Sequence, residues 1–194
     1  MFFLRWPDDE RVRALLRDVS TADFTHSHVG TTRADLEDAP AGYVLDRYGA
    51  PLGRGESVFD AARSALRDFA NYPASFTRAI RLEETFEAGT VFGTVATHFG
   101  FASMNPCRIA FVVDEAEAGR FGFGLGTLPG HAAAGEERFL LTLDPESGLV
   151  HYEVQAISKP AVWLARFGRP AMRLVQGRFR RESCEAMRRL AQGG

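Results

Sequence analysis

Two short polar stretches carry most of the residue types that could do chemistry. The first, SMNPCR, lies between two apolar runs and contains Asn105, Cys107 and Arg108. An Asn-Pro pair is typical of a turn between strands, so we expect a polar turn from Ser103 to Arg108. Its arginine suits a carboxylate or phosphate, because a planar guanidinium donates two parallel hydrogen bonds. Asn105 and Arg108 are therefore candidates for binding a polar ligand headgroup; the alternative is a turn that Arg108 merely covers.

The second stretch, TLPGHAAAGEERF, brings His131, Glu136, Glu137 and Arg138 into a short span. On a strand, Glu136 and Arg138 share one face and Glu137 takes the other, so one carboxylate can point inward. A buried carboxyl group has a raised pKa and can act as a general acid or base. The alternative, which we favour for charged residues near strand ends, is that these side chains pair with each other or with cross-strand neighbours.

Cysteine and histidine give weaker signals. Cys107 could be a nucleophile if His98 or His131 lay beside it, but we expect a small core residue. His26 and His28 alternate on a potential strand and could ligate a metal, yet a lone H-x-H pair is a weak motif and we expect no metal. The sequence has no Walker loop, G-x-S-x-G or H-E-x-x-H motif, and we expect no cofactor.

The segment FGFGLG alternates large residues with glycines. On a strand, Phe121, Phe123 and Leu125 point to one face, whereas the glycines, Gly124 among them, leave the opposite face bare. Something must approach that bare face closely. We favour a neighbouring element or a local bend; the alternative is that the glycines hollow out a ligand cavity.

An ordered series of elements must position these residues. Pro7 to Val19 and Gly55 to Tyr72 have apolar residues at helical spacing, which predicts a helix in each. Tyr43 to Tyr48 is a predicted strand, ended by the turn GAPLGRG. Six further strands are expected between short turn signals, at Phe76 to Leu82, Thr90 to Gly100, Cys107 to Asp114, Arg120 to Leu128, Glu136 to Asp144 and Leu149 to Ser158.

A long amphipathic helix is expected from Pro170 to Gln192, with Val175, Phe179, Ala186 and Leu190 on its apolar stripe. Consecutive strands with short connections imply an antiparallel meander, because parallel neighbours need long crossovers. The predicted fold class is α+β: a curved antiparallel β-sheet gripping the long C-terminal helix. We expect a single domain, 1–194, with an N-terminal extension (1–42) and a helix-grip core (43–192). A hydrophobic ligand would sit between such a sheet and its helix.

The composition is that of an ordinary globular protein, with 45% hydrophobic and 25% charged residues. No run approaches the ~18 apolar residues of a membrane-spanning helix. The N-terminal FFL triplet is followed at once by charged residues, so we expect no signal peptide. Two cysteines are too few for a disulfide framework, and a reducing cytoplasm is the expected location. The sequence carries no signal of oligomeric state.

The C-terminal helix is rich in arginine, with Arg180, Arg181, Arg188 and Arg189 mostly off its apolar stripe. It could act as an interaction module for an acidic partner, nucleic acid or an anionic membrane. We expect no binding to nucleic acid, because the helix lacks exposed aromatic residues or a recognition element. Peripheral membrane contact stays open, although it would need the apolar face that should be gripping the sheet.

Several spaced motifs together resemble a known family: LGRGESVFDAA, SMNPCRIAFVVDE, FGFGLGTLPGH, GEERFLLTLD, ISKPAVWLARFGRP and LVQGRFRRES. The combination is similar to uncharacterised protein family 0548 (UPF 0548), a domain-of-unknown-function family of bacteria and plants, over nearly the whole chain. The element order from Tyr43 to Gln192 also resembles the helix-grip layout of the START and Bet v 1 superfamily. That resemblance implies binding of lipids, hormones or polyketides and, in some members, cyclase or hydrolase activity.

The leading hypothesis is binding of a hydrophobic small molecule or lipid in a cavity between the sheet and the C-terminal helix. The alternative is a cyclase- or hydrolase-type enzyme that uses Glu136 or Glu137, with Arg108 or His131 as partner. No catalytic residue is assigned. The candidate ligand-binding residues are Asn105, Arg108, Phe121, Phe123, Gly124, His131, Glu136, Glu137 and Tyr152.

Overall fold

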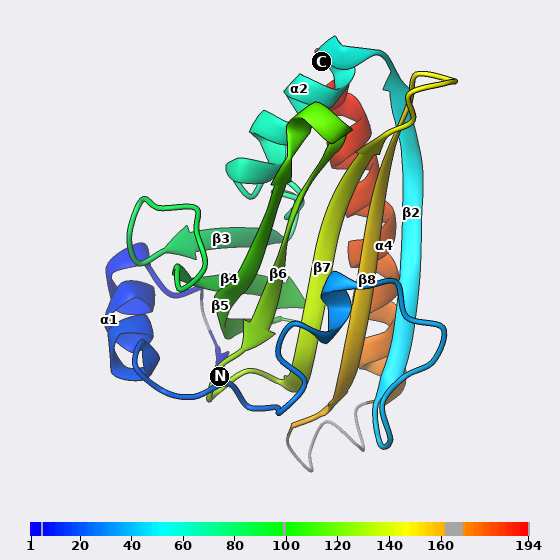
Figure 1. Ribbon diagram of the computed structural model, residues 1–194. Coiled ribbons are helices and arrows are strands. Elements are labelled where there is room, and N and C mark those ends of the chain that lie inside the picture. Colours follow the sequence, from blue (N-terminus) through cyan, green and yellow to red (C-terminus); the bar gives the residue numbers. More distant parts are fainter. Residues whose placement is uncertain (5, 99, 162–168, 194) are drawn as a thin grey trace.

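One curved antiparallel sheet organises the chain (Figure 1). The computed structural model describes residues 1–4, 6–98, 100–161 and 169–193, although the side chains at 2, 98 and 169–173 are not described. In this part of the chain the strand order is β2-β8-β7-β6-β5-β4-β3, and β1 pairs with β5. The strands are β1 (Phe2–Phe3), β2 (Val44–Arg54), β3 (Thr77–Arg81), β4 (Val91–His98), β5 (Phe101–Glu115), β6 (Arg120–Thr127), β7 (Ala133–Leu143) and β8 (Leu149–Pro160).

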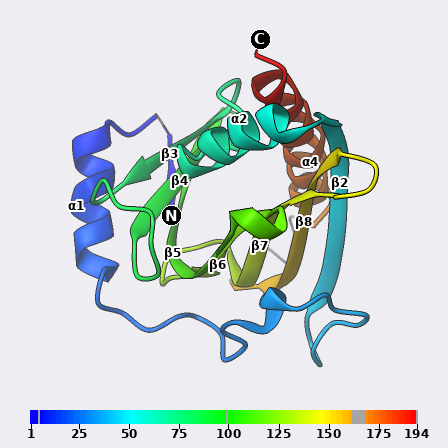
Figure 2. The same cartoon turned by 45° about the horizontal axis from the view of Figure 1, so that its top comes forward.

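Helices lie on both faces of the sheet. The long helix α4 (Arg169–Ala191) and α2 (Glu56–Arg67) lie against the concave face, and the sheet curves around them (Figure 2). The fold class expected from the sequence, a curved antiparallel sheet gripping a long C-terminal helix, is confirmed. None of the helices in the described ranges is both long and apolar enough to cross a membrane.

Helix α1 (Asp9–Val19) packs on the opposite, convex face, over β3 to β5. The Asp8 side chain caps it by accepting a hydrogen bond of 2.8 Å from the Arg11 backbone N–H. Its apolar residues Val12 and Leu16 have no exposed surface, and they contact residues of β3, β4 and β5. The helix predicted from Pro7 to Val19 therefore forms, and its amphipathic stripe covers the outside of the sheet.

The chain between α1 and β2 crosses β7 and β8 on the face opposite α4 (Figure 1). We call residues 20–36 of this chain the N-terminal strap; it contains the short helix η1 (Thr31–Arg33). Backbone and side-chain hydrogen bonds fasten the strap to the sheet: Thr25 N donates to Thr127 O at 3.0 Å, and Leu36 N donates to Gln155 Oε1 at 3.0 Å. The convex face of the sheet is therefore covered by α1 at one side and by the strap at the other.

The expected polar turn from Ser103 to Arg108 is wrong, because this segment is the first half of the continuous strand β5. The turn between β4 and β5 falls instead at Gly100, whose φ of 80° favours glycine. Pro106 is tolerated in mid-strand for a local reason. Its carbonyl accepts a hydrogen bond of 3.0 Å from Leu128 N and therefore points towards β6. The nitrogen of a strand residue points to the same side as its carbonyl. Because β6 ends at Thr127, no strand partner there requires the N–H that proline lacks.

Two further sequence predictions need correction. The segment GAPLGRG does not end a strand at Tyr48 but belongs to β2, which continues with a register shift between Pro51 and Gly53. Because β2 is at the edge of the sheet, it tolerates both a proline and a bulge. On α4, Leu190 is 38% exposed and does not belong to the buried stripe. Ala186 is buried as expected, together with Met187 and Ala191.

Candidate ligand-binding site

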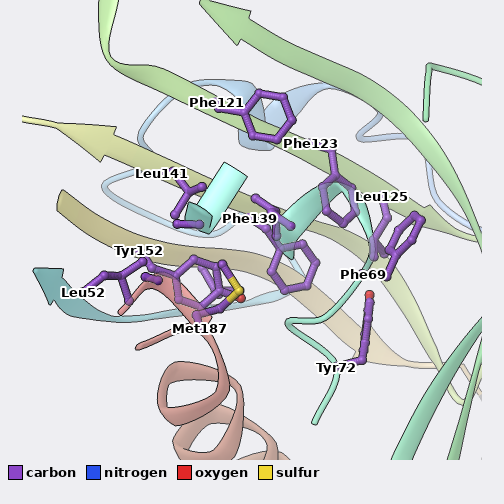
Figure 3. Packing of buried hydrophobic residues seen from close by; sticks show 14 of the residues in the cluster. Leu52, Phe69, Tyr72, Phe121, Phe123, Leu125, Phe139, Leu141, Tyr152 and Met187 are labelled. Atoms are coloured by element: carbon purple, nitrogen blue, oxygen red, sulfur yellow. The ribbon is translucent and has the colours of Figure 1, made fainter. Parts of the chain in front are cut away.

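Aromatic side chains fill the concave side of the sheet near α2 and the C-terminal half of α4 (Figure 3). Phe121, Phe123 and Phe139 point inward from β6 and β7 and have no exposed surface. The ring centroids of Phe123 and Phe139 lie 5.1 Å apart, and Phe69 meets Phe123 edge-on at 5.3 Å. The inward direction expected for Phe121 and Phe123 therefore holds, and both are packed in the main hydrophobic core.

Polar groups without partners lie on the same concave side. Among the described residues, the hydroxyl of Tyr48 (β2) and both side-chain polar atoms of Asn71 are buried and have no partner within hydrogen-bond distance, although the Asn71 side chain lies near the Tyr152 hydroxyl. Asn71 follows α2 and has no exposed surface. Buried polar atoms in native proteins are nearly always paired, so each such exception indicates a missing partner. Glu137 lies near Tyr48 and Tyr72, and Asn71 directly precedes Tyr72 in the chain. We call Tyr48, Asn71, Tyr72 and Glu137 the interior polar set.

Glu137 is the ionisable member of this set without a fixed partner. It points inward from β7, in register with Leu125 on β6 and Ala156 on β8. In the described part of the chain, no hydrogen bond or ion pair reaches its carboxylate. Burial raises the pKa of Glu137 to about 7, and the nearby Arg180 opposes that rise. A carboxyl group with such a pKa changes charge near neutral pH.

The phenols and thiol around Glu137 have perturbed pKa values for the same reason. Burial raises the pKa values of Tyr48, Tyr72 and Cys107, and the neighbouring Glu137 carboxylate raises each of them further. These groups are therefore neutral at physiological pH. The neutral thiol of Cys107 fits the core role expected for it better than that of a nucleophile.

The described residues of the concave face are fully buried at one end and partly exposed at the other. Val150, Tyr152 and Leu141 have no exposed surface where α2 and the end of α4 cover them. Towards the other end of the same face, Glu137 and Ala156 keep part of their surface exposed. In the part of the chain that the structure describes, the concave face is thus least covered at this second end.

Tyr152 lies between the fully buried end and the partly exposed end of the concave face. Its hydroxyl is 3.1 Å from Ser183 Oγ on α4, a buried hydrogen bond that joins the sheet to the helix. Burial raises its pKa, and the Asn71 side chain lies close enough to oppose that rise. Tyr152, predicted from the sequence as a ligand contact, is placed beside the interior polar set, and its hydroxyl already has a protein partner.

The structure separates Glu136 from Glu137. Glu136 points to the convex face, is 1% exposed, and accepts hydrogen bonds from Gly30 N (2.6 Å), Thr32 N (2.8 Å) and Thr32 Oγ1 (2.7 Å). Arg138 on the same face donates to Asp35 at 2.7 Å and Glu153 at 2.6 Å. Arg138 pairs with Glu153 of the neighbouring strand β8, as the pairing alternative expected. Glu136 is instead held by the strap, which that alternative did not include, and Glu137 is the inward carboxylate.

Asn105 and Arg108, predicted as a pair, lie on opposite faces. Asn105 shares the concave face with Cys107, and its Oδ1 accepts a hydrogen bond of 3.4 Å from Ala132 N. Arg108 points to the convex face and donates to the carbonyls of Ser20 (2.6 Å) and Ala22 (2.9 Å). The structure thus gives Arg108 a role in holding the strap, and a headgroup site shared by the two residues does not form.

The bare face beside Gly124 is also the convex one. A Cβ atom on Gly124 would lie 2.3 Å from the ring of Phe111, and one on Gly126 would lie 2.5 Å from Phe24 of the strap. These two glycines make room for neighbouring aromatic rings. This agrees with the interpretation favoured from the sequence, in which a neighbouring element packs closely on the bare face. They do not line the interior polar set.

His131 lies in a separate pocket of about 540 Å³ at the ends of β7 and β8, together with Thr25, Ala132 and Lys159. Its Nδ1 accepts a hydrogen bond of 2.9 Å from Ala133 N, and loss of hydration lowers its pKa to about 4. The Lys159 ammonium sits 4.5 Å from the centroid of the Tyr43 ring. Because these polar groups already have partners, this pocket is a weaker candidate than the interior.

The histidines considered as metal ligands do not share a strand. His26 is buried beside Gly126, whereas His28 packs edge-on against Tyr43 at 4.9 Å. No group of three metal-ligating side chains gathers among the residues that the structure describes. The side chain of His98 lies outside the described residues.

Sequence reasoning missed three members of the interior polar set, Tyr48, Asn71 and Tyr72. Tyr48 points to the same face of its strand as Asp46 and Ala50. Asn71 and Tyr72 lie at the end of the segment whose apolar spacing predicts a helix. Each looks like an element boundary in the sequence. Only the pairing of β2 with β8, and the packing of the α2 end on β7, bring them beside Glu137.

The described geometry, a curved antiparallel sheet around a C-terminal helix, defines a helix-grip protein. Comparison with solved structures agrees. The Zhui aromatase/cyclase of Streptomyces sp. R1128 is 12% identical, with a TM-score of 0.53, over 77% of this chain and 94% of that one. The Thalictrum norcoclaurine synthase is 8% identical, with a TM-score of 0.52, over 78% and 95%. At these identities the likeness shows the fold alone, which is of the Bet v 1 type.

The chain belongs to the family described as "Domain of unknown function (DUF1990)", whose model matches residues 25–186. The UPF0548 protein of Deinococcus radiodurans is 32% identical over 98% of this chain and 99% of its own length. That of Dictyostelium discoideum is 29% identical over 96% of this chain and 94% of its own length. The family resemblance expected from the spaced motifs is therefore confirmed.

Proposed function

We propose that the protein binds a small, largely apolar molecule between the concave face of the sheet and α4. The observation that carries this proposal is the pair of buried side chains, Tyr48 and Asn71, whose polar atoms find no partner within hydrogen-bond distance in the described part of the chain, beside an aromatic core. Leaving a buried polar atom unpaired costs about 1–3 kcal/mol, so a ligand that supplies the partner gains that amount. A mostly apolar pocket with a few convergent polar groups is the usual form of a small-molecule site.

The fold relatives support the proposal at a coarser level. One is named as an aromatase/cyclase, and another was solved in complex with a transition-state analogue. The helix-grip fold thus occurs in proteins that handle small molecules. The site proposed for this chain is defined by its own residues Tyr48, Asn71, Tyr72 and Glu137.

A fluorescence titration with the neutral apolar probe N-phenyl-1-naphthylamine tests the proposal. We expect stoichiometric binding, and we expect Ala156→Phe, which fills the concave face beside Glu137, to abolish it. Ala132→Phe is the matched control, because it adds the same side chain to the pocket at His131. Binding that survives Ala156→Phe and is lost in Ala132→Phe would place the ligand in the other pocket, and no binding to the wild-type protein would refute the proposal.

An acid-base enzyme is a second candidate, favoured by one observation. Glu137 has a pKa near 7 and faces the phenols of Tyr48 and Tyr72, so it could transfer a proton to or from a bound molecule. If so, purified Glu137→Gln should retain a compound that added wild-type protein converts to a new mass. Identical, unconverted ligands in both proteins would leave a binding function only.

We also propose a cytoplasmic location. Both cysteines are free: Cys107 is buried, and Cys184 is partly buried on α4. Labelling of Cys184 by a thiol reagent in intact cells, after membrane permeabilisation but not before, is the expected result. Labelling before permeabilisation would contradict this location.

A further inference from the structure

Glu137 differs from the other carboxylates of the sheet in lacking a donor. Glu136 and Glu153 point to the convex face, where backbone N–H groups and the Arg138 guanidinium satisfy them. Glu137 points to the concave face, where no described donor reaches it. Among the residues that the structure describes, the sheet therefore presents one carboxylate to the concave side without an ion-pair partner.

The described arginines of α4 near this face are committed elsewhere. Arg180 forms an ion pair of 2.6 Å with Asp46, and Arg178 forms one of 2.6 Å with Glu182. Arg188 donates to the Pro51 carbonyl at 3.1 Å. Arg180 still lowers the pKa of Glu137, but its charge is offset by Asp46, which has the opposite effect.

Aromatic rings lie near this carboxylate on the concave side. Tyr72 lies 5.9 Å from Phe139 and 5.7 Å from Phe179, measured between ring centroids. Ring faces carry partial negative charge and attract cations, and a carboxylate among them strengthens that attraction. The same surroundings disfavour a second anion, because a like charge near a buried carboxylate is repelled.

We propose that the polar group of the ligand is a protonated amine, held by Glu137 and the aromatic rings of the interior. The inference rests on the proposed function and names the class of its ligand: an apolar molecule bearing an ammonium group. The ammonium supplies the counter-ion that Glu137 lacks, and it can donate to the hydroxyl of Tyr48 and the amide oxygen of Asn71.

The charge balance at Glu137 involves every element packed around it. Its titratable and charged neighbours are Asp46 and Tyr48 of β2, Tyr72 after α2, Cys107 of β5, Tyr152 of β8, and Arg180 on α4. The phenols and the thiol are neutral, and Asp46 and Arg180 compensate each other. The protonation of Glu137 therefore controls the net charge that a ligand meets.

Three probes of equal length test the inference by displacing N-phenyl-1-naphthylamine: octylamine, 1-octanol and octanoic acid. At pH 8 we expect octylamine to bind about tenfold more tightly than octanol, equivalent to roughly 1.4 kcal/mol, and octanoic acid to bind most weakly. The advantage of octylamine should shrink at pH 5, because Glu137 is then protonated while the amine stays charged.

Glu137→Gln should remove the advantage of octylamine while keeping octanol binding. Glu185→Gln, an exposed change on α4, is the matched control and should leave the order of the three probes unchanged. An equal or better affinity for octanoic acid, or an amine advantage that persists in Glu137→Gln, would overturn the inference. The proposed function itself would fail if neither the three probes nor the naphthylamine bound the wild-type protein. That result differs from both outcomes that would overturn the amine inference.

Discussion

Glu136 and Glu137 are adjacent in sequence and opposite in environment. Glu136 is buried against the strap with three hydrogen bonds, whereas Glu137 faces the interior with none among the described residues. Strand alternation predicts that one of them points inward. It does not predict which, because the sequence shows neither that the convex face is covered by the strap nor which face α4 occupies.

The stability of the protein should depend on pH through Glu137. Its pKa rises from 4.5 to about 7 on folding, so the folded state binds the proton more tightly than the unfolded chain. Stability is therefore greatest below pH 4.5 as far as this group is concerned, and it falls as pH rises to about 7. Since the side chain keeps some contact with water, we expect a loss on the order of 2 kcal/mol.

Urea unfolding of Glu137→Gln at pH 5 and pH 8 measures this effect. The variant should gain stability relative to the wild type as pH rises, because an amide has no proton to lose. A stability difference between variant and wild type that is the same at both pH values would contradict a raised pKa for Glu137.

At the scale of elements, the row of glycines on β6 allows aromatic rings to pack against the convex face. Gly124→Ala would place a methyl group 2.3 Å from the Phe111 ring, and we expect a loss of about 1–3 kcal/mol. Gly177→Ala on α4 is the control, because nothing lies within 4 Å of its added methyl group. There the better helix propensity of alanine should stabilise the protein slightly. Unchanged stability in Gly124→Ala, measured by urea unfolding, would show that the ring of Phe111 moves away at no cost.

The strap is held by buried charges rather than by apolar packing alone. Arg138→Met should remove the buried guanidinium that pairs with Asp35 and Glu153. Because Asp35 is 76% exposed and Arg47 remains 4.0 Å from Glu153, we expect a loss of about 1–2 kcal/mol. Hydrogen exchange should then accelerate at the strap amides of Thr32 and Leu36, which donate to Glu136 and Gln155. The exposed substitution Arg189→Met is the control, and equal exchange in both variants would contradict this role of Arg138.

The sequence predicts the strands and helices of this fold well, and it fails where a local signal has two meanings. Pro106 with Asn105 is a turn signal, but the end of β6 makes room for a proline in the middle of β5. Gly49 and Pro51 look like a turn, but the edge position of β2 tolerates them in a strand. In each case the deciding fact is the length or position of a neighbouring strand, which a single sequence does not contain.

At the scale of the whole molecule, the order of elements was sufficient to predict the helix-grip class, because short connections leave an antiparallel meander as the simple solution. The candidate site could be predicted only in part. Glu137, Phe121, Phe123 and Tyr152 lie on or beside the concave side, whereas Arg108, Glu136 and Gly124 serve the convex face. Their opposite placement follows from the strap, whose path across the sheet has no periodic signal in the sequence.

We propose that residues 1–194 form a single domain. The strap joins the N-terminal segment to β6, β7 and β8 through Thr25, Glu136 and Gln155. Urea unfolding followed by tyrosine fluorescence and by far-ultraviolet circular dichroism should therefore give one coincident transition. Two separate transitions, the first releasing the N-terminal segment, would contradict a single cooperative unit.

Nuclear Overhauser measurements with bound N-phenyl-1-naphthylamine test the central claim, that the interior is the binding site, most directly. The protein would carry isotope labels in its tyrosine and phenylalanine rings and its alanine methyl groups. We expect cross-peaks from the probe to Tyr48, Tyr72 and Ala156, which lie on the concave side near Glu137. Cross-peaks confined to Ala132 and Ala161, in the pocket at His131, would contradict it.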